Sequence, residues 1–106
     1  MSAVISSERD LLEQVIELAH LLHWRVAHFR PALTSRGWRT PVSGDGAGFP
    51  DLLLVRRARI LAVELKSPRG RATEAQLAWL AAFSECGVET HVWQPSDWDQ
   101  VVEALR

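Results

Sequence analysis

The sequence is poor in the residues that build disulfides, zinc fingers and membrane spans. Cys86 is the only cysteine among 106 residues, so neither an internal disulfide nor a cysteine-rich zinc site can form. No apolar run approaches the length of a membrane-spanning helix, and the N-terminus lacks a signal-peptide core. These absences favour a single cytoplasmic domain over residues 1–106, with Cys86 as a small buried side chain near a helix end.

Lysine is as rare as cysteine. Lys66 is the only lysine, beside eleven arginines. The net charge of −1 conceals three blocks, because residues 1–24 carry −3, residues 25–71 carry +7 and residues 72–106 carry −5. A concentrated basic segment is typical of proteins that contact phosphates, although a charged block can also be a solvated surface.

What is present is an alternation of helical and strand patterns. Ser7 is placed to cap a helix over residues 8–23, and Thr73 to cap a second over 73–86. Strands are predicted at 24–29, 51–55, 60–65 and 88–93, and a last helix begins at Ser96. The inward face of the second helix is predicted to consist of Leu77, Leu80, Ala81 and either Phe83 or Ser84. The order α-β-β-β-α-β-α predicts an α/β fold, a mixed sheet flanked by helices.

Residues 30–50 interrupt this pattern. They include three prolines and the stretch Ser43-Gly44-Asp45-Gly46-Ala47-Gly48, and they predict a long, mobile loop. The glycine-rich stretch is not a phosphate-cradling loop, because no Gly-Lys-Ser/Thr follows it. We expect it to form a flexible flap before Asp51.

The residues that carry chemistry cluster at one predicted hairpin. If the turn lies at Arg57-Ala58, Asp51 is directly opposite Glu64, and Lys66 lies on the same face two residues further on. Each feature alone is common, and Glu-Leu-Lys alone is more often a surface ion pair on a strand. Their combination with the sole lysine favours a reactive site.

Two adjacent carboxylates repel each other, and a divalent cation relieves that repulsion. Oxygen ligands at a partly hydrated site suit Mg²⁺ or Mn²⁺, with the Leu65 carbonyl as a further ligand beside Asp51 and Glu64. Such a metal lowers the pKa of a bound water. Lys66 is placed to orient the attacking water or to neutralise the transition state.

Three segments resemble a known family. They are Gly48-Phe49-Pro50-Asp51-Leu52, Glu64-Leu65-Lys66-Ser67 and Thr73-Glu74-Ala75-Gln76. Together they resemble the PD-(D/E)xK nuclease superfamily and, within it, the VRR-NUC domain of phage-type replication and repair nucleases similar to Holliday-junction resolvases. The resemblance covers nearly the whole chain. It implies a restriction-endonuclease-like fold.

The resemblance also implies roles for particular residues. Asp51 and Glu64 would hold the metal, Lys66 would act in the catalytic step and Gln76 would support it from the following helix. An acidic residue on the first helix would lie near the metal. Glu8, directly after Ser7, fits that place best, and the alternatives on the same helix are Asp10, Glu13 and Glu17.

The substrate side is predicted from loops that flank this site. The residues expected to bind nucleic acid are Arg36, Trp38, Arg39, Arg69 and Arg71. His28 could also reach a phosphate, but a structural partner is more usual for a histidine at a strand end.

The sequence thus predicts a Mg²⁺-dependent deoxyribonuclease. It would hydrolyse phosphodiester bonds in branched, flap or duplex DNA during replication, repair or recombination. A homodimer acting on two strands is reasonable. The alternative is a non-catalytic DNA-binding or assembly module that keeps the nuclease fold.

Overall fold

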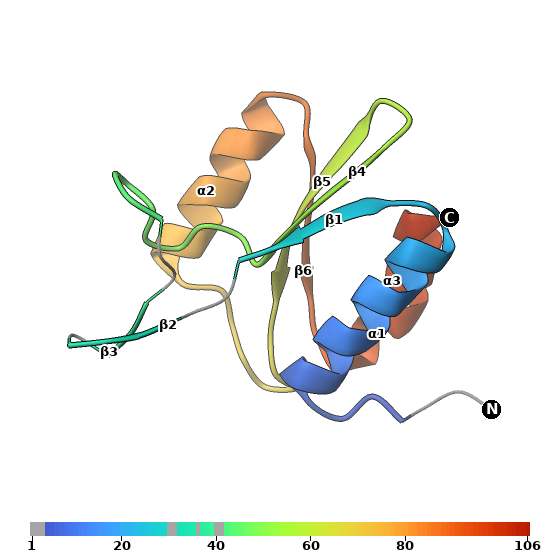
Figure 1. Cartoon of the computed structure of the whole chain (residues 1–106), viewed down its shortest axis with the longest axis horizontal. Coiled ribbons are helices and arrows are strands. Elements are labelled where there is room, and N and C mark those ends of the chain that lie inside the picture. Colours follow the sequence, from blue (N-terminus) through green and yellow to red (C-terminus); the bar gives the residue numbers. More distant parts are fainter. Residues whose placement is uncertain (1–3, 30–31, 36, 40–41) are drawn as a thin grey trace.

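The centre of the molecule is a four-stranded mixed sheet. The computed structural model describes residues 4–29, 32–35, 37–39 and 42–106. The sheet has the order β1-β4-β5-β6, formed by Arg25–His28, Leu52–Arg56, Arg59–Leu65 and Glu89–Trp93. β5 pairs antiparallel with β4 and parallel with β6. Helices α1 (Glu8–Leu21) and α3 (Trp98–Leu105) cover one face, and α2 (Glu74–Glu85) lies against the other (Figure 1). The predicted α/β architecture is confirmed.

The main core lies between the sheet and the pair α1 and α3. Alternate residues of β4 and β5 point to this face, as the period of two in a strand requires. The fully buried side chains of this core include Leu11, Val15, Leu52, Leu54, Leu61, Val63, Trp93, Val101 and Leu105. The predicted caps are also confirmed, because the Ser7 hydroxyl accepts from the backbone N–H of Asp10 and the Thr73 hydroxyl accepts from that of Gln76.

The opposite face is only partly covered by α2. Of the predicted inward face, Leu80 is buried and Phe83 is half-buried, so Phe83 rather than Ser84 is the better of the two alternatives. Leu77 and Ala81 line a cavity against β6 but are exposed, so the prediction that they are buried was wrong. The alanine-rich helix lies against β5 and β6 and turns few large side chains toward them. Cys86, at the C-terminal end of the helix, is exposed rather than buried.

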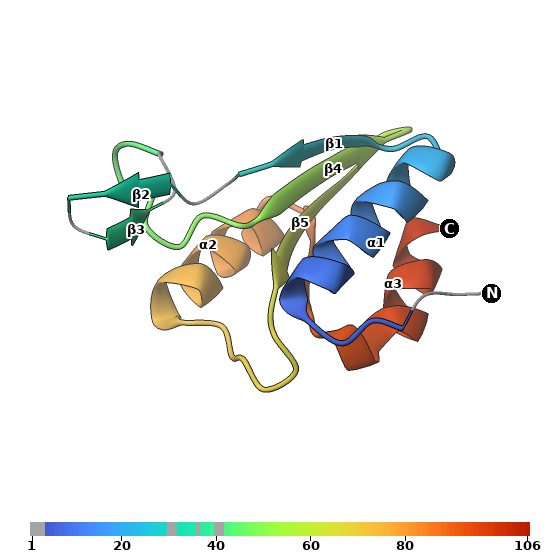
Figure 2. The same cartoon turned by 60° about the horizontal axis from the view of Figure 1, so that its bottom comes forward.

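The segment predicted as one long loop contains a small hairpin. Strands β2 (Ala32–Thr34) and β3 (Gly37–Arg39) pair antiparallel with each other and form a separate sheet. The hairpin projects away from α1 and α3, as an arm on the α2 side of the molecule (Figure 2). We call residues 32–39 the hairpin arm, described except at residue 36. The prediction of an irregular loop over 30–50 was therefore wrong in this part.

The glycine-rich segment before Asp51 is packed rather than loose. A Cβ on Gly48 would lie 2.5 Å from the backbone carbon of Ala75, so the segment touches the first turn of α2. The Phe49 ring packs edge-on against Trp79, and the Trp79 indole N–H donates to the Asp45 carbonyl at 2.9 Å. These contacts fix the approach to Asp51, and the predicted flexible flap was wrong.

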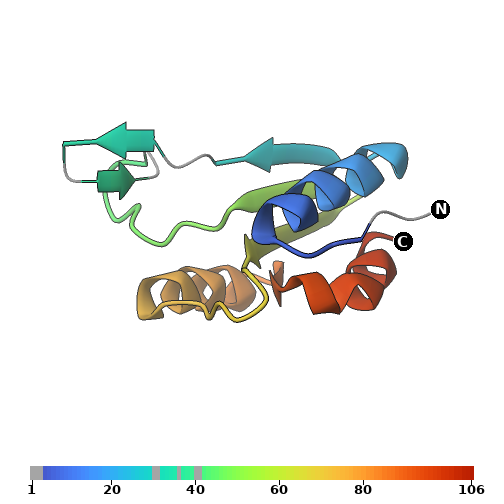
Figure 3. The same cartoon turned by 90° about the horizontal axis from the view of Figure 1, so that it is seen from below.

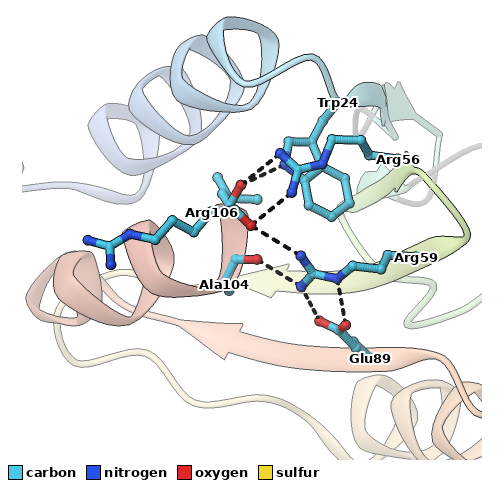
Figure 4. A network of polar contacts seen from close by, with 7 residues as sticks. Trp24, Arg56, Arg59, Glu89, Ala104 and Arg106 are labelled. Carbon is cyan, nitrogen blue, oxygen red and sulfur yellow. Dashed lines mark hydrogen bonds and ion pairs between the residues drawn. The ribbon is translucent and has the colours of Figure 1, made fainter.

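Two arginines at the closed end of the β4–β5 hairpin hold the last turn of α3 (Figure 4). Arg56 lies over the Trp24 ring at 4.4 Å, and Arg59 lies over it at 5.0 Å. Arg59 also forms a two-fold ion pair with Glu89, with both N–O distances at 2.8 Å. Together the two guanidinium groups donate to the carbonyls of Ala104, Leu105 and Arg106. Carbonyls at a helix C-terminus lack intrahelical partners, so these cations satisfy them.

No helix in the described part of the chain is long and apolar enough to cross a membrane.

Candidate active site

The register of the β4–β5 hairpin places Asp51 opposite Glu64. Leu52 pairs with Val63, and the two-residue turn has Arg57 and Ala58 at φ values of 49° and 68°. Both turn residues occupy the left-handed region that tight hairpins require. One step before Leu52, the pairing brings Asp51 to Glu64 at the open end of the hairpin. The predicted register is confirmed.

Asp51 is held by hydrogen bonds to both its side chain and its backbone. Its Oδ2 accepts from the backbone N–H of Leu65 at 2.8 Å, which spans the open end of the hairpin. Its carbonyl accepts from the N–H of Phe29 at 2.9 Å, just beyond β1. The carboxyl group of Asp51 is therefore held at the end of β5 by a backbone N–H of that strand.

Glu64 is the only buried charged residue in the described part of the chain, with 2% exposure. Its Oε1 accepts from Gln76 Nε2 at 3.0 Å and lies 3.5 Å from Lys66 Nζ. Its Oε2 is buried and has no hydrogen-bond partner among the described residues. Burial raises the pKa of Glu64, the neighbouring charge of Asp51 raises it further and Lys66 lowers it, which together leave the pKa at about 8. A buried carboxylate with one free oxygen is costly unless a cation or proton joins it.

Lys66 and Gln76 complete the surroundings of Glu64. Lys66 lies just past the end of β5, and its backbone N–H donates to the Trp93 carbonyl at 2.8 Å. Its side chain is 15% exposed, so the ammonium is held beside Glu64 rather than free in solvent. Gln76 reaches in from the first turn of α2. The structure therefore brings together the hairpin residues and the supporting glutamine that the sequence predicts.

Glu8 is the residue of the first helix that faces this site. The first turn of α1 lies beside the end of β5 (Figure 3). A cavity of about 280 Å³ is lined by Glu8, Arg9, Leu12, His28, Asp51 and Leu65. Partial burial raises the pKa of Glu8, the nearby charge of Asp51 raises it further, and Lys66 lowers it. Glu8 therefore shares an electrostatic environment with Asp51 and Lys66.

Of the alternative acidic residues of α1, Asp10 and Glu13 have other partners and Glu17 is exposed. Asp10 accepts from the backbone N–H and the hydroxyl of Ser6, and these hydrogen bonds lower its pKa. Glu13 is exposed and pairs with Arg9 at 3.4 Å. Glu8 is preferred over Asp10 and Glu13 because it lines the same cavity as Asp51, a placement that the sequence order alone does not establish.

Four of the five predicted nucleic-acid contacts lie in the described part of the chain. Arg69 and Arg71 are exposed on the loop after Lys66, and Arg71 lines a second cavity of about 500 Å³ with Gln94 and Asp97. Trp38 and Arg39 belong to β3 in the hairpin arm. Arg36 lies outside the described residues.

Three residues of the cavity, Arg9, Leu12 and His28, were not among the predicted site residues, and two of them are polar. His28 lies at the end of β1, opposite Leu52, and Arg9 follows Glu8 on α1. Sequence reasoning gave His28 a structural role and did not consider Arg9. The sequence signal that could have pointed to Arg9 is its position directly after Glu8, since neighbouring residues on the first turn of a helix can border the same site.

The donor set suits a hard divalent cation that keeps part of its water shell. Among the residues that the structure describes, no group of three or more histidine, cysteine, aspartate or glutamate side chains is placed to hold a metal ion, so the carboxylate ligands here number at most two. Asp51, the free Oε2 of Glu64 and the Leu65 carbonyl are all oxygen donors. Mg²⁺ is typically held by one or two carboxylates together with water, so the residues present fit it.

Comparison with known proteins gives one family. The model of the VRR-NUC domain matches residues 6–97, which include Glu8, both hairpin strands and Gln76. No curated protein matches the chain. The matched span contains the mixed sheet and its flanking helices, and the fold is restriction-endonuclease-like. With 92 of its 106 residues inside this match, the chain belongs to the VRR-NUC domain family, whose function is DNA processing of the nuclease type.

Proposed function

We propose that the chain is a metal-dependent deoxyribonuclease that hydrolyses phosphodiester bonds with Mg²⁺ or Mn²⁺. The observation that carries the proposal is the meeting of Asp51, Glu64 and Lys66 at the open end of one hairpin. Glu64 is buried there with one oxygen that has no hydrogen-bond partner in the described part of the chain, which a purely structural ion pair would leave unexplained.

In this proposal Asp51, Glu64 and the Leu65 carbonyl hold the cation. When bound, the cation supplies a water of lowered pKa and offsets charge on the phosphodiester oxygens. Glu8 faces Asp51 across the cavity and supplies a further carboxylate at its edge. No nucleophilic side chain is required.

Lys66 has a separate role in the reaction. Its Nζ lies 3.5 Å from Glu64 Oε1, so the ammonium is kept at the edge of the carboxylate pair. From there it orients the attacking water and neutralises charge that develops on the phosphorane-like transition state. Because its side chain is 15% exposed, this charge acts in a partly desolvated setting, where it is more effective than in water.

DNA would reach the site along the surfaces that border it. The hairpin arm with Trp38 and Arg39 projects from the same segment that leads to Asp51 (Figure 2). Arg69 and Arg71 lie on the loop after Lys66. A projecting arm beside a small catalytic domain favours a branched or flap substrate, and a second copy of the chain would provide the second cut that a junction needs. The setting would be DNA replication, repair or recombination.

A cleavage assay tests this proposal directly. Wild type and Lys66→Ala would be incubated with linear duplex, single-stranded, flap and four-way DNA in Mg²⁺, Mn²⁺ or EDTA. We expect metal-dependent cutting by wild type that Lys66→Ala lowers by at least about 10³-fold while DNA binding is retained. Retained turnover in the variant would refute the role of Lys66. Binding without cutting of any substrate by wild type would instead favour the non-catalytic module.

A further inference from the structure

The first turn of α2 connects a helix cap to the candidate metal ligand. Thr73 and Gln76 form a capping box, in which the Thr73 hydroxyl accepts from the Gln76 N–H at 3.2 Å. In return, the Thr73 backbone N–H donates to Gln76 Oε1 at 2.8 Å. The other end of the same side-chain amide, Nε2, donates to Glu64 Oε1 at 3.0 Å. A single amide group thus joins the cap of a helix to a buried carboxylate.

The cap determines which way round this amide lies. The oxygen and nitrogen of a glutamine amide are distinguished by their hydrogen-bond partners. A backbone N–H can only donate, so Thr73 requires the oxygen of Gln76 on its side. The NH₂ group must then face Glu64, where a donor is needed.

The helix alone does not require glutamine at this position. Capping boxes are built with glutamate as well as glutamine, because the cap needs only an acceptor. A glutamate at position 76 would satisfy Thr73 and place a carboxylate against Glu64. Glutamine is the side chain that satisfies the cap and still donates to Glu64.

The donation to Glu64 also decides which of its oxygens is free. Gln76 and Lys66 both lie on Oε1, while Oε2 is buried with no partner among the described residues. The carboxylate is therefore held with Oε2 available to a ligand. The segment before Asp51 packs tightly against the same turn of α2, because a Cβ on Gly48 would lie 2.7 Å from the backbone nitrogen of Gln76. This packing restricts any shift of the turn that carries Gln76.

We propose that Thr73, an exposed residue that contacts neither metal nor substrate, is a positioning residue of the active site. It acts through Gln76: the capping box fixes the amide so that it holds Glu64 with Oε2 directed to the metal. The inference rests on the proposed function only in treating Glu64 as a metal ligand.

The first test follows the Gln76 side chain itself, in the full chain without metal. Thr73→Pro removes the backbone donor at a φ of −77°, which proline adopts readily, and Thr73→Ser keeps both halves of the box. In ¹H–¹⁵N spectra we expect the side-chain NH₂ of Gln76 to give two separate, slowly exchanging resonances in wild type and Thr73→Ser. In Thr73→Pro they should move to the positions of a free glutamine.

The second test separates positioning from stability by a double-mutant cycle. Binding of Mn²⁺ would be measured by calorimetry for wild type, Thr73→Ala, Gln76→Ala and the double variant, and thermal unfolding for all four. Gln76→Ala should weaken Mn²⁺ binding by about 10–100-fold. Thr73→Ala should weaken it by a smaller factor in wild type and not at all in the Gln76→Ala background. The loss of thermal stability caused by Thr73→Ala should be present in both backgrounds, because the Thr73 hydroxyl accepts from the backbone N–H of residue 76, which Gln76→Ala retains.

The outcomes are distinct. Unchanged Gln76 resonances in Thr73→Pro would overturn the inference, as would an equal loss of Mn²⁺ affinity on Thr73→Ala in both backgrounds. If Thr73→Pro does not fold, the Mn²⁺ affinities of the double-mutant cycle decide, because Thr73→Ala keeps the backbone donor to Gln76 and removes only the hydroxyl half of the box. If wild type binds no metal, the proposed function fails, while the Gln76 resonances still decide whether Thr73 orients the amide.

Discussion

Replacing Glu64 by glutamine should stabilise the metal-free protein at high pH and abolish its response to metal. Glu64 is 2% exposed, and its pKa in the folded state is about 8, against 4.5 for the ordinary side chain. A glutamine of the same shape can still accept from Gln76 and carries no charge at any pH. It therefore keeps this hydrogen bond and removes the buried charge.

The sign of the effect follows from the raised pKa. A carboxyl whose folded-state pKa lies above its unfolded value contributes stability below pH 4.5 and loses it as the pH rises through about 8. Each pKa unit corresponds to about 1.4 kcal/mol, so full ionisation would cost roughly 5 kcal/mol, and screening at the mouth of the site reduces this to on the order of 3 kcal/mol. Glu64→Gln should gain this amount at pH 9 and almost nothing at pH 4.

Urea unfolding in EDTA at pH 4, 7 and 9 would measure the difference. At pH 9 the midpoint of Glu64→Gln should lie about 1–3 M above that of wild type. Addition of Mg²⁺ should raise the midpoint of wild type, because a ligand that binds only the folded state stabilises it, and leave Glu64→Gln unchanged. A variant less stable than wild type at pH 9 without metal would refute the reasoning. A variant that responds to Mg²⁺ as wild type does would remove Glu64 from the metal ligands.

Two further predictions concern the neighbours of the site and of the sheet edge. Glu8→Gln should lower the rate of metal-dependent cleavage by about 10–100-fold with DNA binding retained, measured beside Glu17→Gln, an exposed control on the same helix; equal rates for the two variants would remove Glu8 from the site. His91 stacks on Trp93 with ring centroids 4.8 Å apart, its buried Nε2 has no hydrogen-bond partner among the residues that the structure describes, and burial lowers its pKa below 6.5. Its folded form resists protonation, so stability is present above pH 6.5 and lost as the pH falls below it. His91→Phe should keep the stack and lose less stability than wild type between pH 7 and 5 in urea unfolding, and an identical loss in both proteins would contradict this assignment.

The hairpin could be predicted because several local signals agree there. Two apolar runs separated by a short basic turn allow few registers, and a slip of one residue would turn every buried leucine of β4 to the other face. The pairing of Leu52 with Val63 shows that the register was predicted correctly. Asp51, Glu64 and Lys66 follow from that register alone, so this part of the site was accessible from the sequence.

The parts that could not be predicted depend on distant contacts. In α2 the alternation of alanine with larger residues gives no clear inward face, and Leu77 is exposed although it lines a cavity against the edge strand β6. The segment before Asp51 has the composition of a flexible loop. It is nonetheless held by Gly48 against Ala75 and by the hydrogen bond from Trp79, partners about 30 residues away.

The basic block of the sequence likewise divides into two uses that composition cannot separate. Arg56 and Arg59 hold the carbonyls at the end of α3, so they belong to the fold rather than to a phosphate surface. Arg69 and Arg71 remain exposed on the loop after Lys66. Charge counts alone overestimate the surface that DNA could meet, since guanidinium groups also satisfy helix ends.

The free-energy cost of burying the Glu64 charge links this fold to its proposed chemistry. The apolar faces of β4 and β5 fix the hairpin register, and that register forces a carboxylate into a place where its Oε2 has no partner among the described residues. Lys66 and Gln76 both lie on Oε1, so they offset only part of the cost of the buried charge. At neutral pH a proton neutralises the Glu64 carboxylate, and a divalent cation that binds Glu64 must displace this proton. Metal binding should therefore release a proton and strengthen as the pH rises toward 8. Calorimetric titration with Mg²⁺ in buffers of different ionisation enthalpy would detect that proton, and binding without proton release would show that the cation does not meet Glu64.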